Sequence, residues 1–232
     1  MKTPKFFGAL IIAVLFANCS SDDNGTPEPQ ATCLISQAVV NGTSTITFDY
    51  NSSGQIRSVT NYFADGNTRT YAYSGNTILI DLSSETDDDR MRTVTLNGDG
   101  LPENVHDGDQ DYWTNYAFEY DGTKLVKQIY TNSLGDNEES VLEWDGDNVG
   151  ALITGYTLEY YLDQPLQPAD FLSLQYLVEY GVSPIQNANM VKSYTYGTTT
   201  YPFVYDFDED GNITRMDIGN GETIWEFSYI CK

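Results

Sequence analysis

Apolar and polar residues alternate along most of the chain in short runs, and glycine-containing turns separate these runs. In Phe118-Glu119-Tyr120, alternation directs the two aromatic side chains to one face of a strand and the carboxylate to the other. Asn-Gly, Asp-Gly and Ser-Gly pairs supply the positive φ that tight hairpins require. The pattern predicts an all-β fold in which antiparallel strands follow one another in sequence order.

One hairpin pattern recurs along the chain. Residues 205–216 (YDFDEDGNITRM) align without a gap with residues 48–59 (FDYNSSGQIRSV), because both have an aromatic-Asp-aromatic run before a polar turn that ends in Gly. Versions with a shorter turn occur at residues 71–82, 94–105, 118–129 and 142–153. Their starts are about 23–24 residues apart, which is typical of repeat architectures. Each unit is predicted to form two strands of one meander.

The stretch from Asp206 to Asp217 also has the residue spacing of a calcium-binding loop. True loops of that type lie between two helices, whereas the residues on both sides here alternate as strands do. The aligned segment 48–59 has the same pattern of aromatic residues, polar turn and glycine, but it lacks the acidic residues at the turn positions. We therefore expect a hairpin and no cofactor, and the secondary candidate for a metal site consists of Asp206, Asp208, Asp210 and Asp217.

Residues 163–189 interrupt the hairpin pattern. Asp170 is placed to cap a short helix that ends near Tyr180, between flanking prolines and a glycine. The segment is apolar on nearly all sides, so the helix must be buried. We expect this insert to plug one end of the sheet or to lie across it, with a lid over a bound ligand as the alternative.

The strands from Cys33 onward number roughly 14–16. Membrane barrels carry apolar bands on strands of about 9–11 residues, and most strands predicted here are shorter. We therefore expect one domain over residues 33–232. It is predicted to be an antiparallel up-and-down meander that closes into a flattened soluble barrel or a sandwich-like sheet, with one short helical insert.

The first 32 residues differ from the rest of the chain. Residues 1–18 combine two lysines with an apolar run, as a secretion signal does. Cys19 follows in the context LFANC, which resembles a bacterial lipobox and predicts a lipid anchor at Cys19; an ordinary cleaved signal is the alternative. Residues 19–32 are predicted to form a flexible polar tether. The membrane is then contacted through the lipid anchor alone.

The chain is strongly acidic, with a formal net charge of −23. Loss of Lys2 and Lys5 with the signal reduces the basic residues from 11 to 9 against 34 acidic ones and takes the net charge to −25. Nucleic acid is excluded as a partner, because phosphate binding needs a basic surface. A high net charge suits a domain that is exposed to the medium.

Two resemblances follow from these motifs. The segment YDFDEDGNITRM resembles the YD-type hairpins of RHS proteins. The lipid cysteine, the meander and the irregular insert before VKSYTY together resemble a Bacteroidetes family of surface lipoproteins of unknown function with a porin-like fold. Ser-Asp-Asp after Cys19 resembles the export signal of such lipoproteins, which implies display outside the outer membrane, with its periplasmic leaflet as the alternative. The resemblance implies a fold and brings no activity.

Two cysteines lie at the ends of the predicted sheet. Cys33 precedes the first strand and Cys231 ends the last one. With an even number of strands, closure of the sheet makes the first and last strands antiparallel neighbours. Since an exported protein is in an oxidising compartment, we predict a Cys33–Cys231 disulfide. The alternative is two separate small apolar residues, each packed in its own strand.

A meander sorts its turns to two ends. The glycine turns share an end with Cys33, and the other end is predicted to be a solvated acidic rim or a cation-seeking contact surface. Tyr112 and Trp113 lie beside this rim and form a candidate stacking platform for sugars. The acidic residues of this end are Asp65, Glu85, Asp87, Asp88, Asp89, Asp107, Asp109, Asp111, Asp136, Glu138 and Glu139.

Signals of catalysis are poor. The sequence has one histidine, His106, and lacks a Ser-His-Asp order, a metal-spaced His/Cys cluster and a phosphate loop. We therefore expect a non-enzymatic cell-surface lipoprotein that binds glycans or host macromolecules. A structural or accessory protein that acts through protein partners is the alternative, and a glycan-active enzyme, which would need a carboxylate pair, is a remote one. The oligomeric state does not follow from the sequence.

Overall fold

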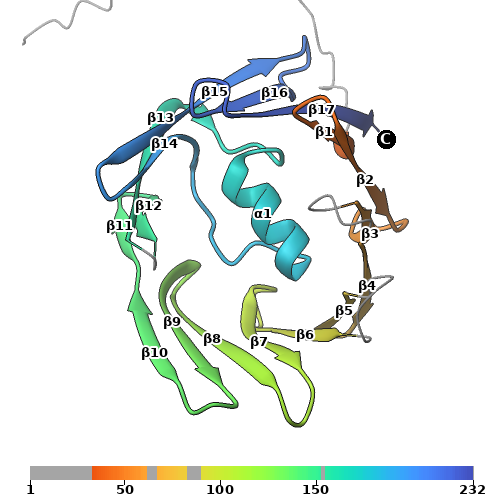
Figure 1. The fold of residues 1–232 in the computed structure, drawn as a ribbon, viewed down its shortest axis with the longest axis vertical. Helices are drawn as coiled ribbons and strands as arrows, with labels where there is room; N and C mark the ends of the chain where they lie inside the picture. Colours follow the sequence, from red (N-terminus) through yellow and green to blue (C-terminus); the bar gives the residue numbers. More distant parts are fainter. Residues whose placement is uncertain (1–32, 62–66, 83–89, 153–154, 232) are drawn as a thin grey trace, which may run out of the picture. The chain divides into compact units, whose positions relative to one another are not determined.

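The computed structural model describes residues 33–61, 67–82, 90–152 and 155–231. The alternating segments form strands and the insert forms a helix, as Figure 1 shows. The strands are β1 (Cys33–Val40), β2 (Ser44–Tyr50), β3 (Ile56–Thr60), β4 (Thr68–Ser74), β5 (Thr77–Asp81), β6 (Met91–Leu96), β7 (Pro102–Gly108), β8 (Trp113–Asp121), β9 (Lys124–Asn132), β10 (Asn137–Val141), β11 (Glu143–Asp145), β12 (Asn148–Leu152), β13 (Tyr156–Pro165), β14 (Asn189–Tyr196), β15 (Thr199–Phe207), β16 (Ile213–Ile218) and β17 (Thr223–Cys231). The helix is α1 (Phe171–Tyr180).

The strands form one antiparallel meander that nearly closes into a barrel. Each strand from β1 to β9 pairs with the next one along the chain, each strand from β11 to β16 does the same, and β1 pairs with β17. The expected all-β meander is therefore confirmed. In Figure 1 the strands surround α1, so the helix lies inside the ring of strands, as the apolar insert predicts.

The strand count of 17 in the described residues exceeds the expected roughly 14–16. The difference arises at Leu142, the single residue between β10 and β11. β10 pairs with β9 and β11 pairs with β12, so one stretch of chain changes partner at Leu142. Because all pairings are antiparallel, β10 and β11 run in the same direction. If β10 and β11 are counted as one strand, the number of strands is even. The first and last strands, β1 and β17, are therefore antiparallel.

The predicted disulfide closes this seam. Cys33 and Cys231 are register partners in the β1–β17 pair, and their sulfur atoms are 2.03 Å apart. We call the end of the sheet that carries this bond the disulfide end, and the opposite end the distal end. The antiparallel order places the turns after β2, β4, β6, β8, β11 and β15 at the disulfide end, as the sequence predicts.

The candidate calcium loop is a hairpin between β15 and β16. The Asp208 carboxylate accepts hydrogen bonds from the backbone N–H groups of Asp210 and Asn212, and Gly211 has a φ of 85°. Asn51, Asn97 and Asn132 form the same side-chain turn, each with a positive-φ glycine three residues later. The acidic spacing therefore reflects a turn that Asn builds equally well.

Alternation along the strands fills the interior. The core residues lie on the inward face of nearly every strand and on α1, and the largest fully buried side chains include Phe203, Ile35, Ile56, Ile78, Ile80, Leu125, Met190, Ile213 and Met216. Within the described ranges, none of the helices has the length and apolarity needed to cross a membrane.

Candidate ligand-binding site

The N-terminus of α1 is held by one buried carboxylate. Asp170 is fully buried and accepts hydrogen bonds from the backbone N–H of Leu172 (3.2 Å) and of Val191 on β14 (2.9 Å), and from the Tyr205 hydroxyl on β15 (3.0 Å). The sequence correctly identifies Asp170 as the N-cap. Burial raises the pKa of Asp170 more than these hydrogen bonds lower it. The cap therefore also joins the helix to two strands.

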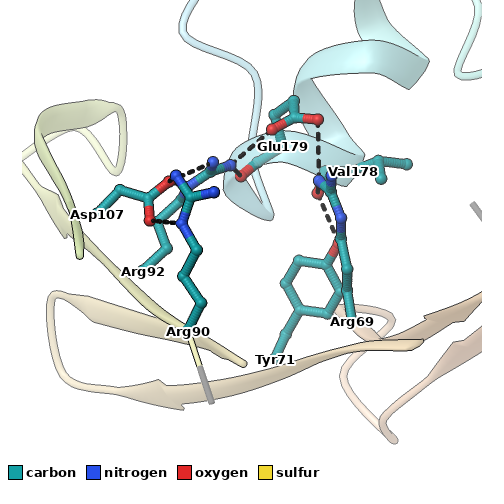
Figure 2. Close-up of polar contacts among 7 residues, drawn as sticks. All are labelled: Arg69, Tyr71, Arg90, Arg92, Asp107, Val178 and Glu179. Carbon is teal, nitrogen blue, oxygen red and sulfur yellow. Dashed lines mark hydrogen bonds and ion pairs between the residues drawn. The ribbon is translucent and has the colours of Figure 1, made fainter. Parts of the chain in front are cut away.

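The C-terminus of α1 is held by side chains from the opposite wall, as Figure 2 shows. Arg69 (3.1 Å) and the Tyr71 hydroxyl (2.6 Å) donate to the carbonyl of Val178, and Arg92 donates to the carbonyl of Glu179 (2.8 Å). The last carbonyls of a helix have no partners within it and carry partial negative charge, so guanidinium donors stabilise this end.

Ion pairs extend this contact into the sheet. Arg92 bridges the carboxylates of Glu179 (2.6 Å) and Asp107 (2.7 Å), while Arg69 contacts Glu179 (2.9 Å) and Arg90 contacts Asp107 (2.7 Å). Burial opposes ionisation of both carboxylates, but the neighbouring arginines outweigh it and lower the pKa of Asp107 and of Glu179. The network fixes α1 against β4, β6 and β7.

Asp107 is buried, whereas the sequence predicts that it belongs to the solvated acidic rim. Its side chain is 3% exposed and lies in the arginine network, so it is not a solvated rim residue. It faces inward because it lies on β7 two residues after the buried Val105. Asp109, Asp111, Asp136, Glu138 and Glu139 are exposed as expected. Asp65, Glu85, Asp87, Asp88 and Asp89 lie outside the described residues, as does Cys19.

A cavity of about 680 Å³ lies between α1 and the inner faces of β8 to β10 and β12 to β14. Its polar side chains are Gln128, Glu138, Ser140 and Gln175, and its aliphatic ones are Leu152, Leu158 and Leu172. Seven aromatic rings line it, from Tyr116, Tyr130, Tyr156, Phe171, Tyr176, Tyr180 and Tyr194. We call it the tyrosine cavity. Pockets of about 300–1,000 Å³ that combine aromatic walls with a few polar groups are typical small-molecule sites.

The rings of this cavity are ordered by contacts with one another. Ring centroids are 5.3 Å apart for Tyr116 and Tyr130, 5.9 Å for Tyr176 and Tyr180, and 5.5 Å for Tyr156 and Tyr194. Burial raises the pKa of Tyr176 to about 12, and it also raises the pKa of Tyr116, Tyr180 and Tyr194. These phenols are therefore neutral near pH 7 and offer both a donor and an acceptor to a ligand.

A second cavity of about 660 Å³, the turn cavity, lies at the distal end beside the turns that follow β7 and β9. Tyr112 and Trp113 line it together, and Tyr130 lines both cavities. Tyr112 is 75% exposed, whereas the Trp113 ring packs against His106 with centroids 6.1 Å apart. The two candidate platform residues thus lie at one cavity, with only Tyr112 freely exposed.

The turn between β7 and β8 is held by the side chain of Asp109 and by a glycine. Asp109 accepts hydrogen bonds from the N–H groups of Asp111 and Tyr112, both at 2.8 Å, and these bonds lower the pKa of Asp109. Gly108 has a φ of 118°, and a Cβ there would lie 2.1 Å from the carbonyl oxygen of Tyr112. Glycine is therefore required for the turn to approach β8 this closely.

The weak metal candidate has other partners. Asp217 pairs with Arg215 at 2.7 Å, Asp206 lies 3.7 Å from the same guanidinium, and Asp208 holds its turn. Across the part of the chain that the structure describes, no group of three or more His, Cys, Asp or Glu side chains is arranged to hold a metal ion. Arg215 therefore competes with any cation for two of the four candidate ligands.

The tyrosine cavity and the arginine network do not follow from the sequence pattern. The tyrosines belong to four strands and α1, and they converge only when the meander closes. The number of tyrosines, 18, together with Tyr176 and Tyr180 four residues apart, is the signal that points toward them.

The fold is similar to a solved structure. A porin-like protein from Bacteroides uniformis superposes with a TM-score of 0.58 at 16% sequence identity, over 85% of this chain and 98% of that one. No protein-family profile matches the sequence, and a search of curated proteins found no similar sequence. At this identity the likeness shows the fold alone.

Proposed function

We propose that this chain is a non-enzymatic lipoprotein of the outer membrane, anchored at Cys19 and displayed at the cell surface, that binds carbohydrate in the tyrosine cavity. The observation that carries the proposal is the cavity of about 680 Å³ with seven aromatic rings and four polar side chains. Aromatic faces suit the apolar faces of sugar rings, and amide, hydroxyl and carboxylate groups suit their hydroxyls. The similar fold of a porin-like protein from Bacteroides uniformis supports the proposed location.

The position of the site agrees with display on a surface. Glu138 and Ser140 lie on β10, Tyr156 begins β13, and Tyr194 lies near the end of β14, so these lining residues are toward the distal end. The tether would join at Cys33, at the disulfide end. A ligand arriving from the medium would therefore meet the cavity on the side opposite the anchor.

The test is a glycan array probed with the full chain in a detergent that has no sugar head group. We expect binding that Tyr176→Ala abolishes and that Phe207→Ala, an exposed aromatic at the disulfide end, leaves unchanged. A blank array would refute carbohydrate binding and favour an accessory role through protein partners. Turnover of a bound glycan would refute the non-enzymatic assignment.

A further inference from the structure

The two cavities lie in sequence along one face of the sheet. Thr114 is paired with Asn132 and Tyr116 with Tyr130 in the β8–β9 register, and opposed residues share a face. Gln128, Tyr130 and Asn132 therefore point to the same side of β9. Gln128 lines the tyrosine cavity, Asn132 lines the turn cavity, and Tyr130 lines both.

Tyr130 is held in place at this junction. Its hydroxyl accepts a hydrogen bond from Asn132 Nδ2 at 3.0 Å, and its ring packs against Tyr116. Asn132 is in turn fixed because its Oδ1 accepts the N–H groups of Leu134 and Asp136. At about 3.3 Å per residue, Gln128 and Asn132 are about 13 Å apart, which is longer than one sugar ring.

The charges along this path disfavour an anionic ligand. Glu138 is the charged residue of the tyrosine cavity, and the turn cavity has Asp107, Asp109 and one cation, Arg90. Both Arg90 Nε and Arg90 Nη2 are bonded to Asp107, at 2.7 and 2.9 Å. The wider domain is strongly acidic, which repels sulfated or uronic sugars.

We propose that the two cavities are successive subsites of one cleft, and that its ligand is a linear, uncharged oligosaccharide that passes over Tyr130. This inference rests on the proposed carbohydrate binding and specifies the length and charge of the ligand. The tyrosine cavity holds one end of the ligand, and Tyr112 covers the part that lies in the turn cavity.

The test is calorimetric titration of the full chain with oligosaccharides of two to seven units. The probes are neutral ladders from α-1,4-glucan, β-1,4-glucan, β-1,4-xylan and α-1,6-mannan, together with oligogalacturonates and heparin fragments. For at least one neutral ladder we expect affinity to rise by about tenfold with length and then reach a plateau, as when one further aromatic contact forms. Tyr112→Ala should remove this gain for long ligands while short ligands bind as before. Tyr176→Ala should weaken ligands of every length.

The outcomes separate the two proposals. Binding whose affinity does not change with length, or a length gain that Tyr112→Ala leaves intact, would refute the extended cleft and leave carbohydrate binding standing. Tighter binding of anionic fragments would refute the uncharged ligand. Absence of binding to every probe would refute both proposals. Phe207→Ala is the matched control, because it removes an exposed ring from the disulfide end.

Discussion

Helix α1 is fixed at its N-terminus by a single buried carboxylate, whereas three arginines and two carboxylates fix its C-terminus. Asp170 accepts three hydrogen bonds from uncharged donors, and burial raises its pKa. Asp107 and Glu179 are surrounded by guanidinium groups, which lower their pKa values. One helix is thus attached to opposite walls by a contact that tolerates protonation and by one that requires ionisation.

Among the substitutions at the two ends of α1, loss of Arg92 should lower the free energy of unfolding the most. Arg92→Met removes the group that bridges Asp107 and Glu179, and so leaves buried carboxylates short of a partner. We expect the free energy of unfolding to fall by about 3 kcal/mol, measured by urea denaturation. Arg57→Met breaks an exposed ion pair with Asp49 and should cost less than about 1 kcal/mol. Equal effects of the two variants would show that the network contributes no more than a surface pair.

Removal of the cap at the other end should cost less. Asp170→Ala leaves the N–H groups of Leu172 and Val191 without an acceptor, and we expect a loss of about 2 kcal/mol in urea denaturation. Asp210→Ala, in an exposed turn, is the control and should change stability little. A loss larger than that of Arg92→Met would reverse the ranking of the two ends.

The two ends of α1 should change the free energy of unfolding in opposite directions as the pH falls. Asp170 has a raised pKa in the folded state, so its protonation stabilises the folded protein as the pH falls through that pKa. This contribution to the free energy of unfolding is complete below the ordinary pKa of 3.8. Asp107 and Glu179 have lowered values, so their contribution is complete above their ordinary values of 3.8 and 4.5 and is lost as pH falls through the folded pKa.

Unfolding measured from pH 7 downward should therefore show wild type gaining stability relative to Asp170→Asn before both lose it in acid. A constant difference between these two proteins at every pH would contradict the raised pKa of Asp170.

The smallest effect should come from Tyr71→Phe. This change removes one of two donors to the Val178 carbonyl and leaves Arg69 in place. We expect a loss of about 0.5–1 kcal/mol in urea denaturation, the net contribution of one hydrogen bond. Tyr112→Phe, at an exposed turn residue, should leave stability unchanged. A cost near that of Arg92→Met would mean that Tyr71, and not the ion pairs, holds this end.

Local chemistry accounts for the parts of the structure that the sequence predicts. Asp170 and Gly181 mark the helix ends, glycine turns mark the hairpins, and the ends of the meander bring Cys33 and Cys231 together. The change of partner at Leu142 is not visible in the sequence, because it depends on how far each neighbouring strand extends. The prediction that Asp107 faces solvent is wrong for a similar reason. Its partners Arg90 and Arg92 precede it by 17 and 15 residues, and they become neighbours only when β6 pairs with β7. Arg92 in turn pairs with Glu179 on α1.

The disulfide also determines how this domain would respond to a mechanical pulling force at its N-terminal end. A pulling force on the residues before Cys33 reaches the sheet at the start of β1. Without a covalent bond there, the hydrogen bonds between β1 and β17 would break one after another from that end. Because Cys33 is joined to Cys231, that force passes through a covalent bond into β17 as well as into β1. Drag on the domain would therefore pull on two neighbouring strands at once, and the sheet would resist being peeled from its seam.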